Sequence, residues 1–265
     1  MSGTSSVSPS RSLSPSQTPS PLTLSGSPSQ SQTATLTHSV PPVPGPYVWW
    51  YEIQTVVWGL SAPKAISVDG AAGFYIAEFG GPYVRWADWA TTYTRHVACT
   101  YGQYGVGGDG GPAQSAICGS PDGVLSDGAG GVYFSDFATS SVRHVWANGT
   151  VTSFLGVESY NTNNAYSGDG GPATLATINS PAHLTGDCAG TVYVANRANH
   201  NVLRVRDGVV VSVAGTPNVA GYAGDFGPAS SALLNNPNGV EFDCVTGRLY
   251  IADTYNSVIR AVLPE

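Results

Sequence analysis

Four residues that could bind a ligand follow four regularly spaced prolines, and their types differ from one position to the next. A histidine, a carboxylate and an amide can offer nitrogen and oxygen ligands to a divalent metal, and a lysine can hold an anion. A single histidine makes a sparse metal set, so we expect no resident cofactor and keep a divalent metal as the alternative. The four residues are Lys64, Asp122, His183 and Asn238.

A second group of charged residues recurs in every copy of a repeat, which is typical of a scaffold because an active site normally occurs once per chain. An acid precedes an arginine by seven residues in three copies, and an asparagine precedes an arginine by eight in the other. We expect charge-assisted bonds between neighbouring strands at these positions. The pairs are Glu78 with Arg85, Asp136 with Arg143, Asn196 with Arg204, and Asp253 with Arg260.

Glycine-rich loops at 108–113, 168–173 and 224–229 each contain one aspartate. A calcium loop needs several acids at alternating positions, and a phosphate loop needs a following Gly-Lys-Ser/Thr. Neither pattern is present, so we expect tight turns in which the proline begins a single helical turn. The sequence also has no Gly-x-Ser-x-Gly nucleophile motif.

The four cysteines fall into two pairs. Cys99 and Cys118 flank one glycine-rich loop, so a disulfide that closes this loop is one hypothesis, and it would suit an oxidising compartment. Cys188 and Cys244 occupy equivalent sites in successive repeats. We expect these two to lie beyond the roughly 7 Å Cα separation that a disulfide tolerates.

Aromatic residues are dense in the first repeat, and Trp86 and Trp89 are the candidates for an aromatic binding surface. Flat aromatic faces can stack on sugar rings. The other interpretation, which we favour, is packing between sheets.

The elements that must position these residues are short strands. The shared prolines at Pro63, Pro121, Pro181 and Pro237 are 58, 60 and 56 residues apart, a period that indicates a repeat architecture. Runs such as 191–195 are rich in β-branched and aromatic residues and are bounded by Gly and Asp, which predicts strands. Four strands fit each repeat, and four-stranded sheets in series are the units of a β-propeller.

The motifs resemble those of the NHL repeat. The resemblance covers about 61–262 and rests on Gly-Asp-Gly-Gly-Pro-Ala, on Pro-Asn-Gly-Val at 237–240 and on the run at 249–260. It implies an all-β, NHL-type propeller, which usually has six blades, whereas four four-stranded blades are visible here. Some NHL-fold lyases hold a catalytic metal with histidines at the channel mouth, where this chain offers only His183.

The sequence divides into a Ser/Pro/Thr-rich segment, 1–46, and a propeller domain, 47–265. The first segment has too few apolar residues to offset its ordering entropy, so we expect a disordered stalk or linker. No signal peptide is recognisable, and no apolar run is long enough to span a membrane. The stalk-like composition nevertheless favours an extracellular or cell-surface protein.

Closure of the ring is expected to involve both ends of the domain. The last repeat has no fourth strand after 258–262, while 53–59 resembles the fourth strand at 151–156. Pairing of 55–58 with 258–262 would remove an exposed edge.

Two functions remain open. A net charge of −7 argues against nucleic acid, which requires a basic surface. The favoured hypothesis is a non-catalytic binding or structural propeller that recognises protein or glycan. The alternative is a metal-dependent hydrolase or lyase at the channel mouth.

Overall fold

The computed structural model describes residues 53–70, 72–160 and 164–264, which belong to one compact unit that begins at Ile53. The predicted stalk, 1–46, lies outside the described residues. Almost all regular structure is β-strand: β1 (Pro63–Asp69), β2 (Gly73–Glu78), β3 (Tyr83–Asp88), β4 (Thr94–Ala98), β5 (Pro121–Ser126), β6 (Val132–Asp136), β7 (Ser141–Val145), β8 (Val151–Leu155), β9 (Pro181–Gly186), β10 (Val192–Asn196), β11 (Asn201–Arg206), β12 (Val209–Ala214), β13 (Pro237–Asp243), β14 (Arg248–Asp253) and β15 (Val258–Val262).

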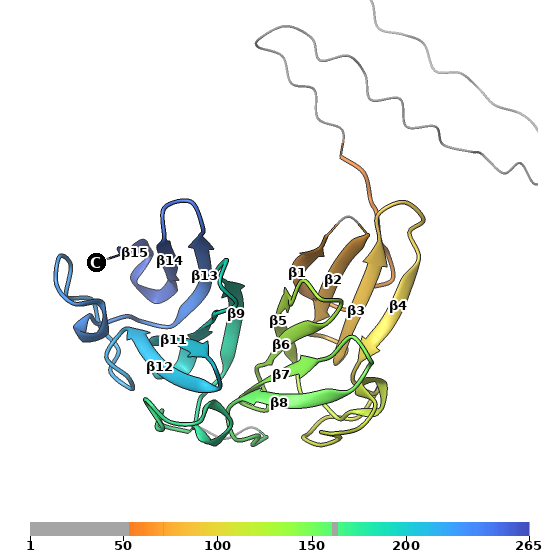
Figure 1. The fold of residues 1–265 in the computed structure, drawn as a ribbon, viewed down its shortest axis with the longest axis horizontal. Coiled ribbons are helices and arrows are strands. Elements are labelled where there is room, and N and C mark those ends of the chain that lie inside the picture. The colour runs from red at the N-terminus through yellow and green to blue at the C-terminus, as the bar shows by residue number, and fades with distance from the viewer. Residues whose placement is uncertain (1–52, 71, 161–163, 265) are drawn as a thin grey trace, which may run out of the picture. The chain divides into compact units, whose positions relative to one another are not determined.

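The strands form four antiparallel sheets, each a simple meander in sequence order. Blades 1, 2 and 3 are β1–β4, β5–β8 and β9–β12, and blade 4 is β13–β15. The first strand of each blade is innermost, and successive blades pack through these strands in the order β1, β5, β9, β13 (Figure 1). The chain is therefore a β-propeller, as its sequence predicts, with four blades in the described part.

Local sequence explains the strand ends. Asp207 and Gly208 join β11 to β12 with φ of 50° and 75°, the left-handed pair that a two-residue hairpin requires. Short 3-10 helices follow the proline of each glycine-rich loop: η1 (Ala113–Ser115), η2 (Ala173–Leu175) and η4 (Ala229–Ser231). Two more, η3 (Arg197–Asn199) and η5 (Thr254–Asn256), lie after β10 and β14.

The glycine-rich loops bind the outer strand of their own blade through backbone hydrogen bonds. In blade 2 the Gly110 N–H donates to the Val151 carbonyl at 2.8 Å. In blade 3 the Gly170 N–H donates to the Val210 carbonyl at the same distance. The repeated glycines thus serve the scaffold.

The closure expectation was wrong for the described chain. Residues 53–62 form no strand, and within the described ranges β15 pairs only with β14. Val57 and Leu60 instead pack against Phe74 and Ile76 of blade 1. Blade 4 consequently has three strands, and the outer edge of β15 has no ladder partner among the described strands.

Two disulfides join neighbouring blades. Cys99 and Cys118 are bridged, with Cα atoms 5.5 Å apart, as the sequence predicted. Cys188 and Cys244 are also bridged, at 5.9 Å, so the expectation that they lie too far apart was wrong. The reason is that both cysteines lie in the turns that follow innermost strands, where neighbouring blades are closest.

The predicted acid–arginine pairs form only in part. Arg85 pairs with Glu78 as expected, whereas Arg143 pairs with Asp109 of the glycine-rich loop and not with Asp136. Asp136 instead accepts hydrogen bonds from the backbone N–H groups of Gly119 (2.6 Å) and Ser120 (2.8 Å).

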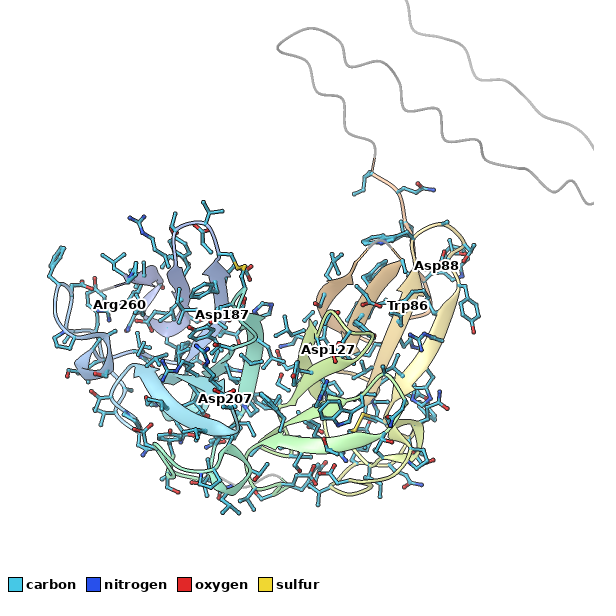
Figure 2. All side chains as sticks on the ribbon, in the orientation of Figure 1. Trp86, Asp88, Asp127, Asp187, Asp207 and Arg260 are labelled. Atoms are coloured by element: carbon cyan, nitrogen blue, oxygen red, sulfur yellow. A yellow bond between two sulfur atoms is a disulfide. The ribbon has the colours of Figure 1, made fainter. Side chains whose placement is uncertain are left out.

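In blade 4 the same arrangement recurs. Arg260 binds Asp225 at 2.7 Å and reaches Asp253 only at 4.0 Å (Figure 2 labels Arg260 in blade 4). Asp253 also accepts the Asn235 N–H at 2.6 Å. The recurring acid therefore fixes the segment before the innermost strand, because its carboxylate faces that segment's backbone.

Blade 3 departs from this arrangement. Leu203, opposite Val194 in the ladder, occupies the position of Arg143, which lies opposite Phe134. Arg204 is its neighbour and lies opposite Tyr193, so the predicted pair of Asn196 and Arg204 does not form. Asn196 accepts the Asn179 N–H and donates to Asn201. Here the Tyr166 hydroxyl replaces the arginine and donates to Asp169 at 2.8 Å.

Candidate functional site

An open cavity of about 350 Å³ touches the innermost strands of all four blades, and β14 and β15 of blade 4 line it as well. Each innermost strand begins at a shared proline, so the first two residues after each proline lie at the same end of the channel. The structure places all four sequence-predicted residues in the lining of this cavity: Lys64, Asp122, His183 and Asn238.

Lys64 and Asp122 form an ion pair across the joint between blades 1 and 2. The Nζ atom of Lys64 lies 3.1 Å from the Asp122 carboxylate, whose side chain is almost buried. The same ammonium lies 4.8 Å from the centre of the Phe79 ring, a cation–π geometry. The lysine side chain is 41% exposed, so it can still meet a ligand.

His183 is oriented by the neighbouring blade. Its Nδ1 lies 2.9 Å from the Val240 carbonyl oxygen, which can only accept a hydrogen bond. Nδ1 must therefore carry the proton, and in the neutral ring Nε2 is left with the lone pair. Such an Nε2 can accept a hydrogen bond from a ligand or bind a metal.

The wall that blade 4 contributes is mixed. Asn238 and Glu241 supply an amide and a carboxylate, while Ile251, Ala252 and Ile259 supply apolar surface. Tyr250 adds an aromatic side chain to the same wall. A cavity with a polar end and an apolar, aromatic wall matches an amphipathic small molecule or an exposed side chain of a larger partner.

Glu241 and Tyr250 were missed by the sequence reasoning. Glu241 occupies the repeat position held by Ser67, Leu125 and Thr185, and it is the only acid of the four. The comparison between repeats that selected His183 could have found it. Tyr250 has a tyrosine at the same position in every other repeat, Tyr75, Tyr133 and Tyr193, so a comparison between repeats does not single it out.

The described residues contain no group of three His, Cys, Asp or Glu side chains placed to hold a metal. Asp122 already bonds to Lys64, which leaves His183 and Glu241 as the free metal-ligand types in the lining. The lining that the structure describes also has no Ser, Thr or Cys side chain that could act as a nucleophile.

The two tryptophans lie in blade 1, away from this lining. Figure 2 labels Trp86 in blade 1. Its Nε1 donates to the Asp69 carboxylate at 3.0 Å, and the Arg95 guanidinium lies over its ring. Trp89 is about half exposed and packs against Phe74 at 4.7 Å between ring centres. They make separate contacts, and their part in binding stays a prediction.

Comparison with known proteins now supports the fold. A scan against models of known families finds no match, and no curated protein matches the sequence. Solved structures do match. A Bacteroides thetaiotaomicron protein of unknown function has a TM-score of 0.59 and 20% identity over 75% of this chain and 46% of its own. An auxiliary nutrient binding protein from Bacteroides ovatus has a TM-score of 0.55 and 16% identity over 78% of this chain and 49% of its own.

A gluconolactonase from Xanthomonas campestris also matches, with a TM-score of 0.52 and 15% identity over 78% of this chain and 59% of its own. The chain therefore spans about half the length of the structures it resembles. At such identities the likeness establishes the β-propeller fold alone. The similar structures include both binding proteins and enzymes. In the part of the chain described, no helix has the length and apolar character of a membrane span.

Proposed function

We propose that this chain is a non-catalytic binding propeller of the NHL type, which recognises protein or glycan through the central cavity. The observation that carries the proposal is the cavity lining, in which residues that differ between repeats converge on one space beside an apolar wall. A binding role is also what the name of the Bacteroides ovatus protein states for that protein.

The proposal extends to domains and location. Two disulfides suit an oxidising compartment, and the Ser/Pro-rich segment 1–46 suits a stalk that displays the propeller domain, 47–265. We therefore place the protein outside the cell or at its surface, with no nucleic-acid partner.

A metal-dependent hydrolase or lyase is the second candidate. It is favoured by one observation, the fixed tautomer of His183, which presents Nε2 as a possible metal ligand. One structural relative, the Xanthomonas campestris protein, is named as an enzyme. This alternative needs further ligands from Glu241, Asp122 or Asn238.

Calorimetric titration with a panel of soluble oligosaccharides and peptides tests the proposal. A ligand that binds wild type should bind Asn238→Ala and His183→Ala at least about tenfold more weakly, the loss expected for about one good hydrogen bond. Arg206→Ala, whose side chain is exposed in blade 3, is the matched control. Equal affinity of the ligand for all variants would show that it binds outside the cavity. A tight stoichiometric divalent ion that His183→Ala loses would favour the enzyme.

A further inference from the structure

Each internal joint between blades buries the same two repeat positions. The first position is the second residue of the third strand in each blade. In blades 1, 2 and 3 it is Val84, Val142 and Val202, which are all 0% exposed. The second lies three residues after the shared proline, and Val124, Leu184 and Val240 are 1–3% exposed. Val84 belongs to the same core cluster as Val124, Val142 to that of Leu184, and Val202 to that of Val240. At each joint the two positions are therefore part of one apolar core.

The two end blades leave these positions uncovered. Ile66 of blade 1 is the equivalent of Val124, and it is 62% exposed. Ile259 of blade 4 is the equivalent of Val84, and it is 70% exposed. The chain therefore presents one half of its own joint at blade 1 and the complementary half at blade 4.

We propose that these two faces bind each other between copies of this chain, with blade 4 of one copy packed on blade 1 of a second copy as in the internal joints. Ile259 and Glu241 of the blade 4 face also line the central cavity, so a docked second copy would cover part of that wall. The occupant of the two faces is a second copy because each copy carries both complementary faces, and the chain already forms this joint three times within itself.

A hydrogen bond that forms at two of the three internal joints, between blades 1 and 2 and between blades 3 and 4, has its acceptor position free on blade 4 and its donor position free on blade 1. The Ser67 hydroxyl accepts the Ser126 N–H at 2.9 Å, and the Thr185 hydroxyl accepts the Phe242 N–H at 3.2 Å. Glu241 stands at the same repeat position as these hydroxyl residues in blade 4, where it is exposed. Its carboxylate is an acceptor for the Val68 N–H of the second copy.

Leu60 continues the free face of blade 1. It lies three residues before the shared proline, as do Ile178 and Leu234, which are 0% and 1% exposed at the internal joints. Ile178 packs with Leu155 and Val142 of the preceding blade. Leu60 would meet the equivalent surface of blade 4 beside Ile259.

This contact is head-to-tail, because different surfaces of the two copies meet. Such an interface makes a specific prediction about mixtures of variants. Ile66→Asp disables the blade 1 face and leaves blade 4 intact, and Ile259→Asp does the reverse. Each variant alone should associate much more weakly than wild type, while an equimolar mixture should form a heterodimer through the one intact joint.

Sedimentation velocity on the full chain measures this. Wild type should associate with increasing concentration, and each variant should weaken association by at least about tenfold, because one apolar side chain of this size contributes about 1.5–3 kcal/mol on burial. Circular dichroism should show both variants folded, since both positions are exposed. Leu175→Asp, at 69% exposure in η2, is the matched control and should associate like wild type.

Three outcomes would overturn the proposal. Wild type could remain monomeric at every concentration, which would leave the two faces without a second copy. The Leu175→Asp control could lose association as strongly as Ile66→Asp and Ile259→Asp do, which would indicate nonspecific hydrophobic association. Ile66→Asp alone could still dimerise, which would mean that like faces meet.

Discussion

At the scale of single residues, the most buried arginine among the described residues is Arg143. Its side chain is 1% exposed, and it pairs with Asp109 while donating to the carbonyls of Gly107 and Ile117 at 3.0 Å each. One side chain thus holds both arms of the glycine-rich loop. The sequence analysis identified the arginine but expected Asp136 as its partner, because the recurring spacing of seven residues was the only guide available.

Replacement of Arg143 by alanine should therefore destabilise the fold. Asp109 and two carbonyls would lose their partner, and the expected loss is about 3–5 kcal/mol of unfolding free energy. Urea denaturation measures it. Arg206→Ala removes an exposed pair with Asp207 and should cost less than about 1 kcal/mol. Equal effects of the two substitutions would mean that the Arg143 network adds nothing to stability.

The pH dependence of stability should report on Asp109. Burial alone would raise the pKa of Asp109, but the hydrogen bond from Ser153 and the charge of Arg143 outweigh it and hold the pKa below its ordinary value. A carboxyl group with a lowered folded-state pKa contributes stability above its unfolded-state pKa, near 4, and loses it as pH falls through the folded-state value.

Asp109→Asn should accordingly show a flatter fall of unfolding free energy with pH below about 4 than wild type does. Denaturation curves at a series of acidic pH values provide the comparison. Parallel curves for the two proteins would show that Asp109 does not contribute to acid lability.

At the scale of elements, the strands could be predicted closely from the sequence, whereas contacts between blades could not. In blade 3 the expected strand 191–195 is observed as β10, Val192–Asn196. Runs of β-branched and aromatic residues and the Gly and Asp residues that bound them are local signals, so they can be recognised in the sequence. The distance between Cys188 and Cys244 depends on how neighbouring blades converge, and no local pattern encodes it.

The same limit applies to the candidate site. The period of the repeat brought Lys64, Asp122, His183 and Asn238 to one mouth, and the structure places them in one cavity. Their ligand-binding role stays a prediction. The pairing of His183 with the Val240 carbonyl could not be predicted, because it crosses from one blade to the next.

The two disulfides should differ in their effect on stability. The first closes a separation of 19 residues and the second one of 56. Chain-entropy arguments give about 3 kcal/mol for the shorter loop and about 4 kcal/mol for the longer one. Both double substitutions should lower the unfolding free energy, and the loss from Cys188→Ser/Cys244→Ser should be larger than the loss from Cys99→Ser/Cys118→Ser. A larger loss from the first pair would point to local strain or packing instead of loop entropy.

At the scale of the whole molecule, the disulfides divide the blades into two covalently joined pairs. Cys99–Cys118 joins blade 1 to blade 2, and Cys188–Cys244 joins blade 3 to blade 4. No disulfide crosses from blade 2 to blade 3 in the described chain. That joint relies on packing around Leu184 and on bonds such as the one from the Ser135 hydroxyl to the Ala182 carbonyl, at 2.6 Å.

A third disulfide can be placed at this joint by copying the first. Gly156 and Ile178 occupy the repeat positions of Cys99 and Cys118, and a Cβ on Gly156 would lie 3.0 Å from the Ile178 side chain. Gly156 has a φ of 94°, and Cys99 holds a cysteine at 78°, so the repeat tolerates this residue type in that conformation. The Ser140 carbonyl lies 2.7 Å from the added Cβ and must shift, and because it is a backbone group this shift strains the chain.

Gly156→Cys/Ile178→Cys should therefore form a bridge and raise the unfolding free energy by up to about 3 kcal/mol, reduced by the strain at Ser140 and the lost Ile178 packing. Thiol titration shows whether the bridge has formed, and urea denaturation with and without reductant isolates its contribution from that of the substitutions. If the joint between blades 2 and 3 opens before the other joints, amide exchange in both disulfide-joined pairs of blades should be slower in the oxidised variant than in wild type. Faster exchange at Leu184 and Val142 in the oxidised variant than in wild type would show that the added bridge distorts the joint.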